Sequence, residues 1–268
     1  MTEAGGVSLT LDGAAALVAF SAPPSNLLGT ARVASIEDRL REAARRREVK
    51  VVAVAARGED FCTGLDPREL SGPGAEALVR AWHSLLRLLL TAEVPTVALV
   101  QGRVLAAGAE LALACDFVFA ETTATFGFPE IRLGLFGTGA SVLLERRVGH
   151  TKAADLIFSG AAMSAEAAER RGLVNALVNP GDLVTALETV RDRLDPFSGS
   201  SLRLAKRALT LGSCGDPLSA LAAVERSFLR DLLPTEDARE GLAALLAERE
   251  PVWKNRYCLL YTSDAADE

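Results

Sequence analysis

Apolar residues in the first half of the chain fall into short runs that are separated by longer stretches of helical period. Runs of this length and composition predict buried strands, and they lie at Val7–Leu11, Ala16–Phe20, Val49–Ala55, Pro95–Val100 and Phe117–Ala120. Between them, Ile36–Arg47 and Ala75–Leu90 have the spacing of amphipathic helices, the second of which stops before a proline. Strands that alternate with helices predict an α/β fold.

Beyond Gly137 the helical period predominates and strand-like runs become rare. The predicted helices of this part are Ala140–Val148, Ala153–Phe158, Ser164–Arg171, Val184–Arg193, Ser201–Leu209, Leu218–Leu232 and Glu236–Arg249. Thr235 is the expected N-cap of the last one, which has acidic residues in its first turn. We therefore expect a core over residues 1–195 and a helical segment over 196–257. Residues 258–268 break the pattern and resemble a non-native tail.

The composition supports a self-sufficient core and points away from disulfides and metal. The chain has 268 residues, of which 49% are hydrophobic. A chain of this length and composition can bury a hydrophobic core that is stable without disulfides or a bound metal. Its cysteines are Cys62, Cys115, Cys214 and Cys258. They are far apart and include no C-x-x-C pair, which favours a reducing compartment over a disulfide framework or a zinc site.

Charge and hydropathy narrow the class of partner. The N-terminus lacks the features of a signal peptide, and no apolar run reaches the roughly 18 residues that a membrane span requires. The net charge of −6 argues against a broad nucleic-acid surface. We expect a cytoplasmic, soluble protein that meets an anionic ligand with a few local basic side chains and with backbone N–H groups at helix starts.

A small-residue turn joins two apolar runs in the segment VALVQGRVLAAGAELALACDFVF, residues 97–119. Ala106, Ala107 and Gly108 allow a ligand to approach the backbone closely. A helix that begins here would direct free N–H groups at a developing negative charge. Glu110 follows at once, so a carboxylate is expected at the edge of a buried element.

A second carboxylate, Glu130, follows Pro129 within the apolar stretch FGFPEIRLGLFGTG. Apolar surroundings raise the pKa of a carboxyl group, as acid/base work near neutral pH requires. Upstream, DFCTGLDPREL offers Gly64 as a flexible turn and the N–H of Leu65 as a second backbone donor. The residues thus predict two acid/base carboxylates and an oxyanion hole made of main-chain groups.

The stretches FCTGLD, AAGAELALACD and FGFPEIRLG stand in the order and spacing of three motifs of the enoyl-CoA hydratase/isomerase (crotonase) family, which this chain resembles. Similar stretches, SGAAMSAEAAERRGLVNALV, SSLRLAKRAL and TEDAREGLAALLAEREPVW, extend the resemblance from about Val7 to Arg256. It implies an α/β, crotonase-like (ClpP/crotonase) spiral of ββα units with a C-terminal helical oligomerisation segment. It also implies a homotrimer or a dimer of trimers.

Residue by residue, the resemblance implies that Glu110 and Glu130 match the catalytic carboxylates of hydratases. The N–H groups of Leu65 and Ala107 match the oxyanion hole. The activity implied is the addition of water across the double bond of an α,β-unsaturated acyl-CoA. Coenzyme A then belongs to the substrate, and neither a metal nor a further cofactor is expected.

Further residues are expected to contact the substrate or its coenzyme A part, namely Cys62, Gly64, Asp66, Arg68, Gly108 and Thr138. The chain also departs from the family pattern. Ala106-Ala107-Gly108 replaces three glycines and places a methyl group beside the oxyanion site, and Thr138 stands where hydratases commonly have a water-orienting glycine. Ser21-Ala22-Pro23 lacks the usual basic residue, which leaves Arg68 as the expected contact of the coenzyme A phosphates.

Three alternatives stay open at this level. The stretches PEIRLGLF, SSLRLAKRAL and WKNR resemble the alicyclic dienoyl-CoA hydratases, so cyclohexa-1,5-diene-1-carbonyl-CoA is an alternative substrate, and enoyl-CoA isomerisation is an alternative reaction. A different class of function would be RNA binding through the basic run at residues 45–47, which the negative net charge disfavours. A catalytically silent homologue is the third alternative.

The two glutamates also have structural interpretations. Glu110 could be a solvated residue at a helix start, where the helix dipole favours a negative charge. Glu130 could be a buried carboxylate paired with Arg132, Arg146 or Arg147.

Other polar residues of the motifs have similar interpretations. Asp66 is more often a turn-stabilising residue than a nucleophile, and Asp116 is expected to fix a strand or a turn. His83 is expected to be a packing or surface residue, or a wall of the acyl pocket. Cys62 and Cys115 are interpreted as small buried hydrophobic residues.

Overall fold

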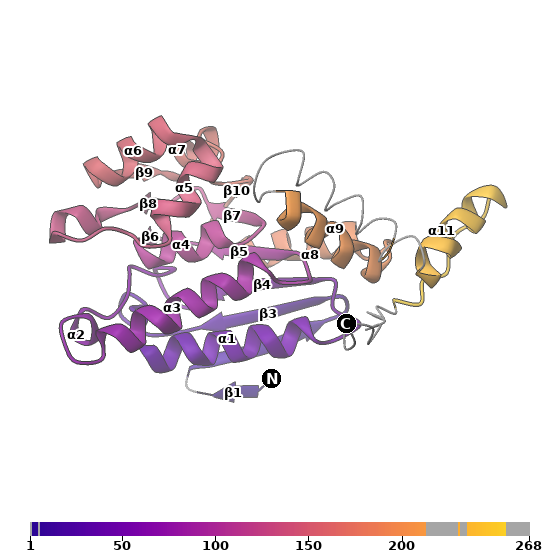
Figure 1. Cartoon of the computed structure of the whole chain (residues 1–268), viewed down its shortest axis with the longest axis horizontal. Helices are drawn as coiled ribbons and strands as arrows, with labels where there is room; N and C mark the ends of the chain where they lie inside the picture. Colours follow the sequence, from indigo (N-terminus) through magenta and orange to yellow (C-terminus); the bar gives the residue numbers. More distant parts are fainter. Residues whose placement is uncertain (1, 5, 213–229, 231–234, 256–268) are drawn as a thin grey trace, which may run out of the picture. The chain divides into compact units, whose positions relative to one another are not determined.

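The computed structural model describes residues 2–4, 6–212, 230 and 235–255. The chain forms two compact units, Met1–Leu194 and Asp195–Glu268. Figure 1 shows the helices and strands of both units. The predicted helix at 218–232, apart from residue 230, and the predicted non-native tail at 258–268 lie outside the described residues.

A seven-stranded sheet forms the centre of the first unit, in the order β1-β2-β3-β4-β5-β7-β10. Its strands are β1 (Thr2–Ala4), β2 (Val7–Asp12), β3 (Ala15–Phe20), β4 (Val51–Ala56), β5 (Thr96–Val100), β7 (Phe117–Glu121) and β10 (Ala176–Val178). The pairs β1·β2 and β2·β3 are antiparallel, whereas all pairs from β3 to β10 are parallel. Parallel strands need cover on both faces, which explains their continuous apolar runs.

The two faces of this sheet carry two separate cores. Along β4, Val52 and Val54 belong to the larger core, while Val51 and Ala53 belong to the smaller one, because successive side chains of a strand point to opposite faces. The helices α1 (Thr30–Ala44) and α3 (Ala75–Leu90) supply the larger core and pack against each other, as Figure 1 shows. The helix α8 (Leu183–Leu194) supplies the smaller core.

A second sheet of three short strands lies beside the site described below. Its strands are β6 (Arg103–Leu105), β8 (Thr125–Gly127) and β9 (Ala162–Ser164). β6 pairs in parallel with β8, and β8 pairs antiparallel with β9. Each strand has three residues, which is too short for an alternating pattern to be recognised in sequence.

The remaining helices of the first unit follow the motifs. They are α2 (Pro67–Leu70), α4 (Ala107–Ala114), the 3-10 helix η1 (Pro129–Leu133), α5 (Ala140–Val148), α6 (His150–Ser159) and α7 (Ala165–Arg170). α4 is buried along its whole length. This explains why its sequence has no polar face.

The predicted helix bounds were right for α3 and α5 and wrong for α1. α1 was expected at Ile36–Arg47, but it begins at Thr30, after the N-cap Gly29, and ends at Ala44. Gly29 lacks the side-chain oxygen that would mark a helix start in sequence. The basic residues 45–47 therefore follow the helix and do not form its last turn.

The second unit contains α9 (Gly199–Gly212) and α11 (Glu236–Leu246). Thr235 is confirmed as the N-cap of α11, because its hydroxyl accepts a hydrogen bond from Ala238 N at 3.1 Å. α11 ends three residues before the predicted Arg249. In the described part of the chain, no helix is long and apolar enough to cross a membrane.

Candidate active site

Glu110 lies in the first turn of α4 with 2% of its surface exposed. Its Oε2 accepts a hydrogen bond from the Trp82 indole at 2.7 Å. Its Oε1 accepts two further bonds of 2.9 Å from the backbone N–H groups of Gly139 and Ala140, at the start of α5. The interpretation of Glu110 as a solvated helix-start residue was therefore wrong.

The surroundings of Glu110 oppose one another in their effect on its charge. Burial raises the pKa of Glu110, while the hydrogen bonds from Ala140, Trp82 and Gly139 and the nearby His83 lower it, and the net shift is upward. All three hydrogen-bond partners are donors, so they match an ionised carboxylate, which only accepts. The N-terminus of α5 adds a favourable dipole.

Glu130 lies in η1, and its Oε2 is buried without a hydrogen-bond partner in the described part of the chain. Burial raises its pKa, and the charge of Glu110 raises it further. The interpretation of Glu130 as half of an ion pair with Arg132, Arg146 or Arg147 was wrong, since the described residues supply Glu130 with no such pair.

The two carboxylates converge on Gly137. A Cβ built on Gly137 would lie 2.8 Å from Oε1 of Glu110 and 2.8 Å from Oε1 of Glu130, so the two oxygens are no more than twice that distance apart. A Cβ on Gly139 would lie 2.8 Å from Oε2 of Glu110. Any side chain at either glycine would fill the space around the carboxylates.

Trp82, Gly137 and Gly139 are site residues that the sequence reasoning missed. The two glycines of FGTG were a signal for close backbone approach, which the motif comparison passed over. For Trp82, the sequence offered only a buried aromatic position on an amphipathic helix.

The backbone N–H groups of Leu65 and Ala107 are both left out of secondary-structure hydrogen bonding. Leu28 N donates to Gly64 O at 3.0 Å, and Asp66 N donates to Leu28 O at 2.9 Å. These two bonds use the carbonyl of Gly64 and the N–H of Asp66, and neither uses the N–H of Leu65. Ala107 is the first residue of α4, and a first helical residue has no intrahelical acceptor for its N–H.

The segment containing Leu65 passes directly against the start of α4. Leu105 N donates to Cys62 O at 2.9 Å, and a Cβ on Gly108 would lie 2.2 Å from the same oxygen. Glycine is therefore required at position 108. This contact brings together the two loops predicted to form the oxyanion hole.

Ala106 adopts φ 52° and ψ −123°, a conformation that L-residues rarely populate. Strain of this kind costs about 1–3 kcal/mol and persists only where the surroundings enforce it. The Ala106 methyl lies 3.5 Å from the position of a Cβ on Gly64. The methyl group of Ala106, where the family pattern has glycine, thus reduces the free space between the two loops that carry the N–H groups of Leu65 and Ala107.

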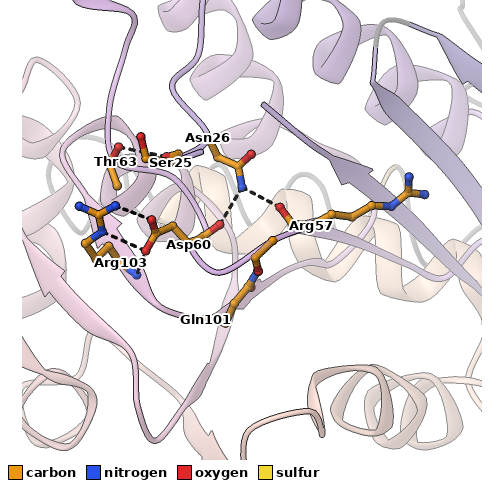
Figure 2. A network of polar contacts seen from close by, with 8 residues as sticks. Ser25, Asn26, Arg57, Asp60, Thr63, Gln101 and Arg103 are labelled. Carbon is orange, nitrogen blue, oxygen red and sulfur yellow. Dashed lines mark hydrogen bonds and ion pairs between the residues drawn. The ribbon is translucent and has the colours of Figure 1, made fainter. Parts of the chain in front are cut away.

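A polar network braces these loops (Figure 2). The Asp60 carboxylate accepts the backbone N–H of Arg103 at 2.9 Å and its guanidinium at 3.0 and 2.6 Å. The Asn26 amide donates to Asp60 O at 2.7 Å, and the Thr63 hydroxyl donates to Ser25 O at 3.0 Å. The network fixes the segment that follows β4 against the start of β6.

A cavity of about 740 Å³ lies next to this segment, and Asp66, Arg68 and Arg32 contribute to its wall. Asp66 is the N-cap of α2, where its carboxylate accepts the N–H of Arg68 at 2.8 Å. This is the turn-stabilising role expected for Asp66. Arg32 is a second basic residue of this wall that the sequence reasoning did not select.

The remaining candidates have mainly structural contacts. Cys62 is buried, and burial raises the pKa of its thiol to about 12, which excludes a thiolate nucleophile near neutral pH. Cys115 is buried as well. Asp116 holds β5, because its carboxylate accepts the N–H of Thr96 at 2.7 Å. His83 lies 2.8 Å from the hydroxyl of Thr138.

The described residues contain no group of three or more His, Cys, Asp or Glu side chains that could hold a metal ion.

The chain was compared with known proteins. Residues 11–256 match the model of the enoyl-CoA hydratase/isomerase family. The cyclohexa-1,5-dienecarbonyl-CoA hydratase of Thauera aromatica is 33% identical over 250 residues, which are 93% of this chain and 96% of that protein. An enoyl-CoA isomerase/hydratase of Mycosarcoma maydis is 30% identical over 212 residues, 77% of each chain.

Solved structures show the same fold. The enoyl-CoA hydratase from Bacillus anthracis superposes with a TM-score of 0.86 at 26% identity, over 94% of this chain and 100% of that one. An enoyl-CoA hydratase from Polaromonas superposes with a TM-score of 0.85 at 28% identity, over 93% and 100%. The predicted crotonase-like α/β fold is thereby confirmed, and the chain belongs to the enoyl-CoA hydratase/isomerase family.

Proposed function

We propose that this protein is an enoyl-CoA hydratase that adds water across the α,β double bond of an acyl-CoA, with Glu110 and Glu130 as its acid/base pair. The observation that supports this most directly is the convergence on Gly137 of two carboxylates, the buried Glu110 and the partly buried Glu130. Glu110 accepts three hydrogen bonds, whereas Oε2 of Glu130 has no hydrogen-bond partner among the described residues. Paired groups in such different environments are typical of acid/base sites.

In the proposed mechanism, the carboxylates hold one water on the β-carbon of the substrate. Glu110 accepts a hydrogen bond from this water, and its three donors oppose the effect of burial, which raises its pKa. Glu130 has a raised pKa and an open Oε2, so it is the group that donates a proton to the α-carbon and regains one from the water. The water oxygen bonds to the β-carbon, and the π electrons move onto the thioester.

The N–H groups of Leu65 and Ala107 are proposed to bind the thioester oxygen while it carries the enolate charge. Both amides are outside the secondary-structure hydrogen bonds. Removing one donor from an oxyanion hole typically costs about 10²–10³ in rate. Cys62 and Gly108 would support the hole through the close contact of their backbones.

Coenzyme A is proposed to lie with its phosphates at the cavity walled by Arg68 and Arg32. Guanidinium groups bind phosphates well because their donors form a fork that matches two oxygens. The acyl end would then reach past Gly64 to the carboxylates, with Thr138 beside it.

A second candidate substrate is cyclohexa-1,5-diene-1-carbonyl-CoA. The Thauera aromatica relative carries this activity in its name and covers almost the whole chain. The chemistry at the two carboxylates would be the same, and only the shape of the acyl pocket would select the alicyclic group.

The test is the loss of enoyl-thioester absorbance when purified protein meets crotonyl-CoA and, separately, cyclohexadienoyl-CoA. Glu110→Gln and Glu130→Gln are each expected to lower kcat about 10²–10⁴-fold, the usual contribution of a positioned acid or base. Glu188→Gln, an exposed position on α8, is the matched control and keeps full activity. Turnover that does not depend on either glutamate, or no turnover of either substrate, would contradict the proposal.

A further inference from the structure

Two consecutive residues of α3 reach the site at different points. The Trp82 indole donates to Oε2 of Glu110 at 2.7 Å. The His83 imidazole places Nε2 at 2.8 Å from the Thr138 hydroxyl. Neighbouring residues on a helix point about 100° apart, so one helix contacts both the carboxylate and the turn beside it. The mechanism proposed above assigns no role to the contact between His83 and Thr138.

Thr138 occupies the centre of the turn that holds the catalytic carboxylates. On one side of it, Gly137 faces both Glu110 and Glu130. On the other side, Gly139 and the residue after it donate their N–H groups to Glu110. The position of this turn therefore sets both the hydrogen bonding of Glu110 and the gap between the two carboxylates.

The turn is held on its C-terminal side by hydrogen bonds to Gly137 O from the N–H and the hydroxyl of Ser141, at 3.0 and 2.8 Å. Two of its residues, Gly137 and Gly139, are glycines, which have the largest backbone freedom of all residues. Within residues 137–140, Thr138 is the one residue whose side chain can form a hydrogen bond. Its hydroxyl is thus the one side-chain group of residues 137–140 through which another element can hold the turn, in addition to the backbone contacts with Glu110, and its partner is His83.

We propose that His83 is a positioning residue that fixes the catalytic turn through the Thr138 hydroxyl. This inference rests on the proposed function, because it concerns the placement of Glu110 relative to Glu130. Misplacing a reacting group by about 1 Å can cost 10²-fold in rate. Loss of the His83–Thr138 contact should therefore lower kcat, while substrate binding at the proposed coenzyme A cavity is kept, because neither residue lines that cavity.

The test compares kcat and KM of four variants on whichever enoyl-CoA the wild type hydrates. His83→Leu removes the imidazole, and Thr138→Val removes the hydroxyl at nearly equal volume. Each is expected to lower kcat about 10–10²-fold and to change KM less than about 3-fold. Thr138→Ser keeps the hydroxyl and is expected to stay within about 3-fold of wild type.

The double variant His83→Leu/Thr138→Val is the decisive one. If the two residues act through one contact, the double variant is expected to be no slower than the slower single variant, because interacting residues are not additive. His150→Leu, the chain's other histidine, exposed on α6, is the matched control and keeps wild-type kcat. A thermal unfolding curve is measured for each variant and for the wild type, to show that every variant in the kinetic comparison is folded.

Several outcomes would overturn the inference. They are an unchanged kcat in His83→Leu, losses that multiply in the double variant, or a Thr138→Ser variant as slow as Thr138→Val. A rise in KM with kcat unchanged would assign the pair to substrate contact instead. If Glu110→Gln and Glu130→Gln lose their activity while His83→Leu keeps the wild-type kcat, only this inference fails. If the glutamate variants stay active, the proposed function fails first.

Discussion

At the scale of the residue, the buried oxygen of Glu130 is a feature of the candidate site that is expected to lower the stability of the protein. A carboxylate oxygen without a donor is costly to bury in its charged form. Its neighbour Glu110 has three donors and no such deficit. The oxygen of Glu130 that has no partner among the described residues therefore lowers the stability of the fold when its carboxyl group is ionised.

This imbalance predicts how the stability of Glu130→Gln depends on pH. Burial raises the pKa of Glu130, so its ionisation is harder in the folded state than in the unfolded state. The destabilisation is absent below the ordinary carboxyl pKa. It appears as the pH rises through that value, and it is complete above the raised pKa. The Gln variant should thus melt higher than wild type at about pH 8, and the difference should shrink towards about pH 4.

The measurement is thermal unfolding of both proteins across this pH range, with the exposed Glu188→Gln as the control. A melting difference that is the same at all pH values would show that ionisation of Glu130 does not carry the effect.

At the scale of the element, the short strand β6 is the part on which the geometry of the proposed oxyanion hole would depend. β6 leads directly into the strained Ala106 and the start of α4. Its position is fixed by Asp60, whose carboxylate binds both the backbone and the guanidinium of Arg103 (Figure 2). The hydrogen bonds of Arg103 hold the pKa of Asp60 below its ordinary value.

Asp60→Asn is expected to lower kcat about tenfold and stability by about 1 kcal/mol. An amide in place of the carboxylate presents one donor to the guanidinium and loses the charge-assisted bonds. Urea unfolding and the thioester assay measure the two effects. Glu76→Gln removes an exposed ion pair with Arg80 and should change neither. An unchanged rate in Asp60→Asn would show that β6 holds its position without this network.

At the scale of the whole molecule, the second unit has its own buried polar centre. Asp237, at the start of α11, is 1% exposed. It accepts hydrogen bonds from the hydroxyls of Ser198 and Ser200 at 2.6 and 3.1 Å. It also accepts the backbone N–H groups of Lys254 and Asn255 at 2.7 and 2.9 Å. One carboxylate thus joins three separate stretches of this unit.

Asp237→Ala is expected to loosen the second unit while the first stays folded. The substitution leaves four donors without their acceptor, of which the Ser198 and Ser200 hydroxyls are buried, and a buried donor left unsatisfied costs about 1–3 kcal/mol. Limited proteolysis should therefore cut the variant faster within residues 195–255, and a fragment close to the first unit should accumulate. Equal digestion of wild type and variant would contradict this role. The predicted homotrimer or dimer of trimers stays a prediction.

Much of the core could be predicted from the sequence because buried segments have a recognisable pattern of apolar residues. Apolar runs and helical periodicity within a single segment are enough to predict several elements, namely the strands β2, β3, β4, β5 and β7 and the helices α3 and α5. The same holds for the three motifs, which identified the family and selected Glu110 and Glu130. The family is confirmed, and the catalytic roles of Glu110 and Glu130 stay a proposal.

What only the tertiary structure decided are the contacts between segments that lie far apart in the chain. Trp82 donates to a glutamate 28 residues away, and Gly139 donates to the same glutamate from 29 residues away. The strands β6, β8 and β9 exist because they pair with each other across such separations. A periodic pattern shows which face of a segment is buried, but not which partner meets it there. The choice of hydrogen-bond partner is made by packing in three dimensions, so the donors around Glu110 had to be seen in the fold.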